Sequence, residues 1–220
     1  MRRIIGGVFQ SLDGVMQAPG GPSEDPTGGF AHGGWMFPVA DETVGEAIGA
    51  FFSGPYDLLL GRRTYDIFAA YWPYAEGEGA AMGAAFTAAN KYVLTRGEQE
   101  LPWENSHRLR GMDDVAALKQ GDGPALLIQG SSTIYPALLA AGLLDRLRVY
   151  TFPLVLGPGK RLFGEGTPPG TLKMVDHKVS PGGVVIATYK PAGPVATGSF
   201  GQIDSPREEE RQRRMKERTW

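Results

Sequence analysis

The chain has 220 residues, of which 42% are hydrophobic, and it carries a formal net charge of -2 at pH 7 with a pI of about 6.0. This length holds one large domain or two small ones, and the apolar fraction is enough to bury a core. Acidic and basic residues are mixed along the sequence, without the basic stripe of a nucleic-acid-binding protein, so no nucleic-acid partner is expected.

The sequence contains no cysteine, which excludes disulfides, thiolate metal sites and cysteine nucleophiles. The three histidines, His32, His107 and His177, lie far apart, and no metal site is expected. The apolar stretch after Met1-Arg2-Arg3 is too short for a secretory signal, and no run reaches membrane-spanning length. These features predict a cytoplasmic protein with no membrane partner.

The first part of the chain predicts a strand, a long loop and a helix. Residues 3–10 form a short apolar segment that runs into the turn sequence Ser11-Leu12-Asp13-Gly14. Residues 19–34 are rich in Gly and Pro and long for a connector, which is typical of a lid or binding loop. Residues 41–52 place apolar side chains on one helical face, with Asp41 positioned as the N-cap.

The middle of the chain alternates strands and helices. Strands are predicted at 57–60, 91–94, 125–128 and 146–156, and helices at 62–71, 80–89, 113–119 and 132–141. Such alternation indicates an α/β fold with a mostly parallel central sheet. Residues 171–179 and 184–189 alternate apolar and polar side chains around Ser180-Pro181-Gly182-Gly183, which predicts a C-terminal antiparallel hairpin.

One domain is therefore expected over residues 1–190, followed by a tail over 191–220. Residues 191–204 have a linker composition. A helix start is indicated by Ser205, by Pro206 at the first helical position, and by Glu208 three residues after the cap. Because the tail has few apolar residues, a solvated tail is favoured over a docking helix.

Three predicted strands end in sequences suited to a polyanion. They are Gly61-Arg62-Arg63-Thr64, Thr95-Arg96 and Gly130-Ser131-Ser132-Thr133. If the strands are parallel neighbours, these ends meet at one sheet edge, where amides, hydroxyls and guanidinium groups would hold phosphates. Each segment alone is also compatible with an ordinary turn or helix cap. Their combination predicts a phosphorylated cofactor.

The second of these strand ends favours NADP(H) over NAD(H). An NAD site usually has an acidic residue there to hold the ribose hydroxyls. This chain has Thr95 and Arg96 instead, which suit a 2′-phosphate.

Four groups of residues together carry a family resemblance. They are Ser11-Leu12-Asp13-Gly14; Gly61-Arg62-Arg63-Thr64-Tyr65; Gln129-Gly130-Ser131-Ser132 with Tyr135; and Leu143-Leu144-Asp145 through Leu156-Gly157-Pro158-Gly159-Lys160-Arg161-Leu162-Phe163. In this order the chain resembles the dihydrofolate reductase superfamily over residues 1–190, and more closely the branch related to the reductase domain of riboflavin biosynthesis. The resemblance implies a three-layer α/β/α fold, NADPH as the hydride donor, and often a homodimer.

The resemblance also assigns cofactor contacts. Arg62, Arg63 and Thr64 would meet the phosphates, and Thr95 and Arg96 the adenosine-ribose end. The segment Gly130–Thr133 would wrap the pyrophosphate, and Tyr135 would lie close to the nicotinamide.

Roles on the substrate side remain open. Asp41 is either the family's catalytic carboxylate or only a helix cap, with Trp35 leading into its helix and Thr151 matching the threonine that supports that carboxylate. Asp13 is either a turn residue or a catalytic and binding group facing the nicotinamide, with Ser11 beside it. Gln129 stands where the riboflavin branch typically has glutamate, which argues against that branch's pyrimidine substrate.

The sequence thus predicts an NADPH-dependent reductase that transfers hydride to a small heterocyclic or carbonyl-containing substrate. The alternative is a non-catalytic protein that binds a nucleotide or another small molecule on the same fold.

Overall fold

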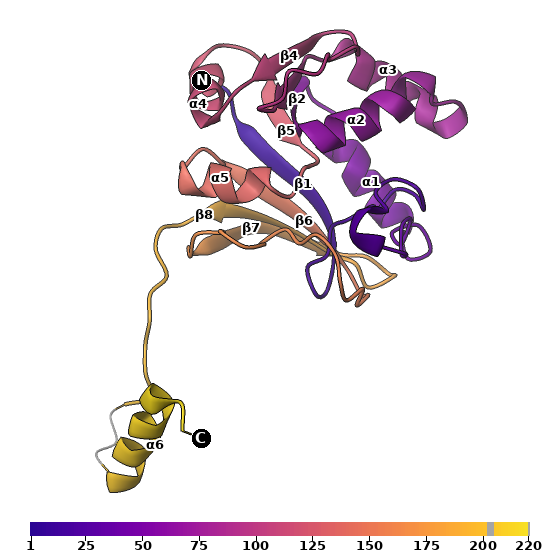
Figure 1. Cartoon of the computed structure of the whole chain (residues 1–220). Coiled ribbons are helices and arrows are strands. Elements are labelled where there is room, and N and C mark those ends of the chain that lie inside the picture. Colours follow the sequence, from indigo (N-terminus) through magenta and orange to yellow (C-terminus); the bar gives the residue numbers. More distant parts are fainter. Residues whose placement is uncertain (202–204, 220) are drawn as a thin grey trace.

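The computed structural model describes residues 1–201 and 205–219, and its centre is a mixed eight-stranded sheet in the order β4-β3-β2-β5-β1-β6-β8-β7 (Figure 1). The strands are β1 (Ile4–Ser11), β2 (Tyr56–Gly61), β3 (Lys91–Leu94), β4 (Ser106–Leu109), β5 (Ala125–Ile128), β6 (Arg146–Phe152), β7 (Leu172–Val179) and β8 (Val185–Pro191). Neighbouring pairs among β1 to β6 are parallel, whereas β8 runs antiparallel to both β6 and β7. The predicted mostly parallel sheet with a C-terminal hairpin is confirmed.

Helices cover both faces of this sheet, because alternate strand residues point to opposite sides. The helices of the domain are α1 (Glu42–Phe51), α2 (Arg62–Tyr71), α3 (Ala80–Ala88), α4 (Met112–Gln120) and α5 (Ile134–Ala140). Leu59 and Ile128 pack with α4 and α5 on one face. Leu58, Leu60 and Leu127 face the other way, toward α1, α2 and α3. This arrangement confirms the predicted three layers.

The structure contains one strand that was not predicted, and the bounds of β6 and α5 are among those that differ from the sequence prediction. Strand β4 was not predicted, because Ser106-His107-Arg108-Leu109 contains one large apolar residue and pairs at the sheet edge. Strand β6 ends at Phe152 rather than at 156, because Pro153 has no N–H for the ladder. Helix α5 begins at Ile134 rather than at 132, because the preceding residues form a turn in which Ile134 N donates to Ser131 O at 3.1 Å.

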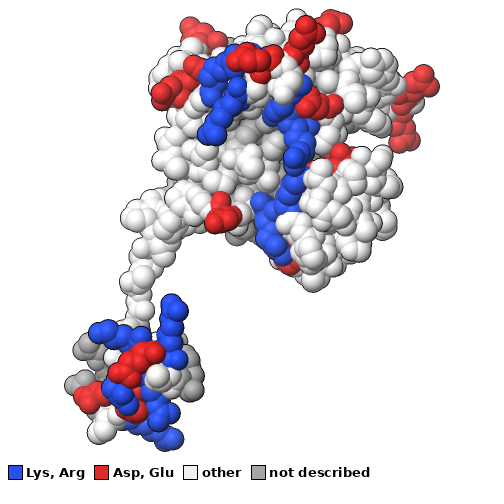
Figure 2. All heavy atoms as spheres, viewed as in Figure 1, with Lys and Arg blue, Asp and Glu red and all other residues white. Residues whose placement is uncertain are grey.

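The tail contains helix α6 (Pro206–Glu217), which begins where the cap signals placed it: Ser205 accepts a hydrogen bond from Glu208 N. Its charged side chains pair along the helix, as in Arg213 with Glu210 and Glu217. Figure 1 shows α6 apart from the sheet, and Figure 2 shows its mixed basic and acidic surface. Among the helices described, none is long and apolar enough to cross a membrane.

Candidate functional site

A cavity of about 1380 Å³ opens where β2, β3 and β5 end. It is lined from these strand ends by Gly61, Arg62, Arg63, Thr64, Leu94, Thr95, Arg96, Gln129, Gly130, Ser131, Ser132 and Thr133. In the view of Figure 2, a band of basic side chains runs beside a hollowed part of the surface. The three strand ends singled out by sequence therefore meet at one site.

The topology explains why the cavity lies here. After β2 the chain enters α2 on one face of the sheet, and after β5 it enters α5 on the opposite face. Because β2 and β5 are neighbours, the two connections diverge and leave a crevice above their carboxyl ends. Ligands of open α/β sheets bind at such a switch point.

Two glycines allow the ends of β2 and β5 to approach closely. Gly61 N donates to Gly130 O at 3.1 Å. A Cβ on Gly61 would lie 2.4 Å from Ser131 Oγ, and a Cβ on Gly130 would lie 2.6 Å from Thr64 Oγ1. The Thr64 and Ser131 hydroxyls are 3.2 Å apart. Larger side chains would therefore fill the floor of the cavity.

Hydrogen-bond donors at this floor are available to a ligand. In the described part of the chain, the backbone N–H groups of Ser131, Ser132 and Thr133 have no protein acceptor. The first turn of α2 begins beside them at Arg62, so the positive end of its dipole lies at the cavity. Amides and a helix N-terminus together favour an anionic group.

The arginines of the cavity differ in how they are engaged. Arg62 is bound within the protein: Nε donates to Asp66 at 2.8 Å, and Nη1 donates to Gln99 O at 3.1 Å. Arg63 and Arg96 are exposed, and no partner for either guanidinium is found over residues 1–201 and 205–219. Two positive charges therefore remain for a ligand.

Thr95 fixes the start of the segment that carries Arg96. Its backbone N–H donates to Leu109 O at 2.9 Å, and its hydroxyl accepts from Gly97 N at 3.1 Å. The side chain is buried at the cavity wall. Thr95 therefore shapes the segment as well as lining the site.

Six predicted site residues lie outside the cavity lining, and three of them are Asp41, Trp35 and Tyr135. Asp41 caps α1, accepting from Val44 N at 3.1 Å and from Gly182 N at 2.8 Å, and the second of these bonds is the main cause of a lowered pKa for its carboxyl. Trp35 is buried and donates to Gln17 O. Tyr135 is buried beneath the sheet and donates to Ile128 O, and burial raises the pKa of its phenol. Their roles in catalysis or binding stay predictions.

The remaining predicted residues near the end of β1 also bond within the protein. The Asp13 carboxylate accepts from Ser11 Oγ, Leu156 N and Gly157 N, and the bond from Ser11 is the largest cause that lowers its pKa to about 2. Thr151 accepts from Gln10 Nε2 at 3.3 Å. Ser11, Asp13 and Thr151 do not line the cavity in the described structure.

Sequence reasoning missed an apolar wall and an acidic residue of the cavity. Phe9, Met16, Met36 and Ile48 line it from β1, the following loop and α1. Glu24 comes from the predicted loop at 19–34; burial raises the pKa of its carboxyl, and Gly20 N donates to it at 2.6 Å. A single carboxylate in an irregular loop gives no periodic signal, so the sequence could not single it out. In the described residues no group of three or more His, Asp or Glu is arranged to hold a metal ion.

Comparison with known proteins gives the family. The model of the RibD C-terminal domain matches residues 2–186. A curated relative, the uncharacterized protein YyaP of Bacillus subtilis (strain 168), is 26% identical over 198 residues, which cover 86% of this chain and 94% of that protein.

Solved structures share the fold. A putative riboflavin biosynthesis protein from Shewanella sp. PV-4 matches with a TM-score of 0.64 and 21% identity, over 86% of this chain and 99% of that one. Dihydrofolate reductase from Enterococcus faecalis, complexed with NADP(H) and RAB-propyl, matches with a TM-score of 0.54 and 16% identity, over 86% and 96%. The fold is thus dihydrofolate reductase-like, and the chain belongs to the RibD C-terminal domain family.

Proposed function

We propose that this protein is an NADPH-dependent reductase that transfers hydride to a small heterocyclic or carbonyl-containing substrate. The observation that carries the proposal is the cavity at the ends of β2, β3 and β5, where, in the part of the chain that the structure describes, three amides lack protein acceptors and two arginines lack partners. Membership of a family whose solved neighbours include named reductases supports it.

The floor of the cavity would hold the diphosphate. The residues Arg63, Thr64, Ser131, Ser132 and Thr133 all line the cavity. The guanidinium of Arg63, the hydroxyl of Thr64 and the three serine and threonine N–H groups are the donors that would meet the phosphates. Gly61 and Gly130 let the backbone approach the phosphates as closely as the pyrophosphate sites of dinucleotide-binding folds require. Arg62 would contribute charge, but its donors are largely occupied by Asp66 and Gln99.

The end of β3 would hold the adenosine 2′-phosphate. Arg96 is exposed and lines the cavity, and Thr95 lies next to it in the lining. Arginine binds phosphate through charge-assisted hydrogen bonds, whereas NADH would leave this guanidinium without a partner. NADPH should therefore bind more tightly than NADH.

The apolar part of the cavity would hold the reacting rings. NADPH supplies a hydride when bound, and the residues of this chain would orient the acceptor and exclude water. Phe9, Met16 and Met36 give an apolar wall, and Gln129 gives an amide at its edge. The proton that accompanies the hydride would come from water or a carboxyl. Asp41 and Asp13 lie outside the cavity lining, whereas Glu24 lines the cavity and burial raises the pKa of its carboxyl.

The test is oxidation of NADPH by the purified protein with a panel of ketones, imines and oxidised heterocycles. A reductase is expected to consume NADPH with one class of acceptor and to give a product reduced by two electrons. Tight binding of NADPH without turnover on any acceptor would instead favour a non-catalytic binding protein.

We also propose a homodimer that uses β7. This strand is at the sheet edge, and Met174, Val175 and Val179 expose 49%, 43% and 58% of their surface. An unpaired edge strand with apolar side chains is a template for pairing with another chain. Sedimentation velocity should give the mass of two chains, and Val175→Lys should shift the species toward one chain; a monomeric wild-type protein would contradict the dimer.

A further inference from the structure

Arg108 in strand β4 and Arg110 directly after it both reach the loop after β3. Arg108 donates to Gly97 O, and also to Gln99 O at 2.5 Å. Arg110, directly after β4, donates to Gly97 O at 3.3 Å and pairs with Glu98 at 2.7 Å. The loop 96–99 is therefore held from the neighbouring edge strand.

This loop begins with Arg96, one of the residues that line the cavity. It has no regular secondary structure, so its conformation depends on such side-chain bonds. The carbonyls of residues 96, 97 and 99 all accept from arginines, the first at 3.4 Å from Arg110. Arg62 of α2 gives Gln99 O a further donor at 3.1 Å. Arginine donors, together with the bonds of Thr95, therefore hold the loop from which Arg96 extends.

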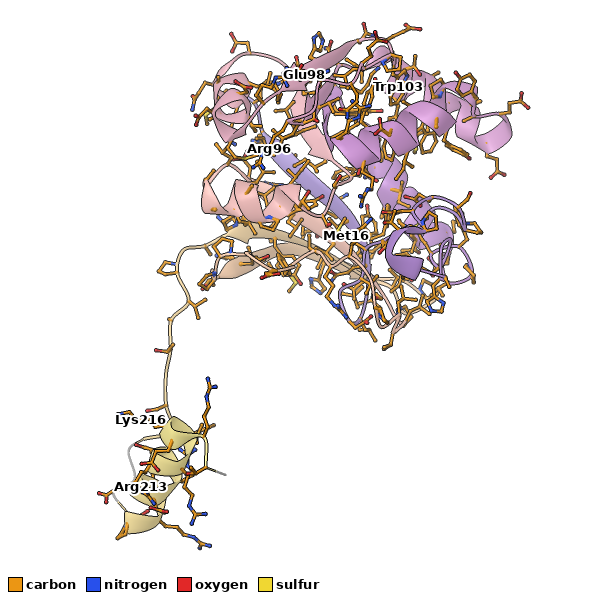
Figure 3. All side chains as sticks on the ribbon, viewed as in Figure 1. Met16, Arg96, Glu98, Trp103, Arg213 and Lys216 are labelled. Carbon is orange, nitrogen blue, oxygen red and sulfur yellow. The ribbon has the colours of Figure 1, made fainter. Side chains whose placement is uncertain are left out.

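Glu98 is the acidic residue of the same loop. Figure 3 places Glu98 beside β4 and Arg96 nearer to α5. The ion pair between Glu98 and Arg110 is exposed, with side-chain exposures of 79% and 49%, so it adds little to stability. Its effect is on local charge: it neutralises a carboxylate two residues from Arg96.

A carboxylate at this position would favour NADH over NADPH. A carboxylate near the end of the second strand binds the ribose hydroxyls of NAD and repels a 2′-phosphate. If Glu98 were released from Arg110 and turned toward the cavity, it would bind the ribose hydroxyls and repel the 2′-phosphate.

We propose that Arg110 and Arg108 are positioning residues for coenzyme selectivity: Arg110 holds Glu98 away from the 2′-phosphate, and Arg108 fixes the loop that presents Arg96. This inference rests on the proposed NADPH function. Neither residue lines the cavity, so each acts through the loop.

The test compares the dissociation constants of NADPH and NADH for wild type, Arg110→Met, Glu98→Gln and the double variant, followed by nicotinamide fluorescence. Arg110→Met should weaken NADPH binding about fivefold, since an unpaired carboxylate then faces the phosphate, and should leave NADH binding unchanged or tighter. Glu98→Gln should bind NADPH like wild type. The double variant should recover most of the NADPH preference.

The loop-fixing role of Arg108 is tested in the same assay. Arg108→Met should weaken NADPH binding more than NADH binding, and Arg108→Lys should recover part of the loss. The matched control is Arg146→Met, which removes an exposed arginine at the start of β6 and should leave both constants unchanged.

The outcomes separate this inference from the proposed function. If wild type prefers NADPH and Arg110→Met keeps the same ratio, or if the double variant does not recover it, the inference is wrong while the proposed function stands. Wild-type protein that binds neither coenzyme contradicts both.

Discussion

At the scale of single residues, the floor of the cavity depends on the absence of two side chains. Gly61 and Gly130 bring the backbones of β2 and β5 into hydrogen-bonding distance, with the hydroxyls of Thr64 and Ser131 filling the space around them. The sequence indicated Gly61 as part of a segment that would hold phosphates. It could not show that the group nearest to Gly61 is Ser131, because that contact joins residues far apart in the chain.

Gly61→Ala tests this close approach. Its Cβ would lie 2.4 Å from Ser131 Oγ and 3.0 Å from Ser131 N, so the β5 end must move. We expect a loss of about 1–3 kcal/mol in the free energy of unfolding from overpacking. NADPH affinity should fall at least about tenfold, since donors displaced by an ångström no longer meet the phosphates. Urea denaturation and coenzyme titration measure the two effects.

The matched control is Gly45→Ala in α1. Nothing lies within 4 Å of a Cβ at this position, and alanine is the better helix former. It should stabilise the protein by about 0.5–1 kcal/mol and leave coenzyme affinity unchanged. If Gly61→Ala behaves like this control, the close approach of Gly61 and Ser131 at the cavity floor is contradicted.

Asp13 is expected to join the end of β1 to the segment after β6. Its carboxylate accepts from Leu156 N and Gly157 N and has a pKa of about 2, below the ordinary 3.8. The charged form is favoured in the folded state, so this stabilisation is present above about pH 4 and is lost as the pH falls toward 2. Asp13→Asn should cost about 1–2 kcal/mol at pH 7.

The measurement for Asp13 is urea denaturation of wild type and Asp13→Asn from pH 6 to pH 2. The difference in unfolding free energy should shrink between about pH 4 and pH 2. A difference that does not change with pH would contradict the hydrogen-bonded carboxylate. A variant that loses turnover without losing stability would point instead to the predicted catalytic role.

At the scale of elements, the three strands whose ends line the cavity could be predicted from the sequence, whereas the edge strand β4 could not. Strands β2, β3 and β5 are apolar runs followed by turn residues, and this pattern identifies a buried parallel strand. Strand β4 is polar, short and half exposed, so its pairing with β3 is a tertiary effect without a local signal. The sequence therefore indicated Arg96 but not its supports, Arg108 and Arg110.

The arginines at the ends of β2 and β3 should contribute differently to binding. Arg63→Met should weaken the binding of NADPH and of NADH alike, by about tenfold, because both coenzymes contain the diphosphate. Arg96→Met should weaken NADPH binding by about ten- to hundredfold, with little effect on NADH binding. Parallel titrations of each variant with NADPH and NADH measure these changes in affinity. If Arg96→Met lost the same affinity for both coenzymes, the assignment of the 2′-phosphate to Arg96 would be contradicted.

At the scale of the whole molecule, the cavity follows from sheet order. Because β5 lies between β2 and β1, chain segments far apart in sequence share one edge, and loop residues such as Glu24 complete the site. The fold class and the family could be predicted from the sequence, because strands and helices alternate along the chain and the family motifs occur in the expected order. The substrate side was not, because its apolar wall is assembled from isolated residues in β1, a loop and α1.

The tail is expected to be dispensable for the fold. Thr171 holds the chain through Gly193 O and Pro194 O, whereas the described residues beyond are mostly exposed, and α6 bonds within itself. A chain ending at Pro194 should unfold at the same temperature as the full chain, within about 2 °C. A large drop in calorimetry would show that the tail packs on the domain or on a second subunit.

The central claim is that the cavity at the ends of β2, β3 and β5 binds NADPH through its 2′-phosphate. The most direct measurement is a titration of the full-length protein with NADPH and, in parallel, NADH, followed by nicotinamide fluorescence. The account predicts saturable binding with NADPH at least about tenfold tighter, the contribution of one charge-assisted phosphate contact. Equal affinity for the two coenzymes would contradict the role of Arg96, and binding of neither would contradict the proposed reductase.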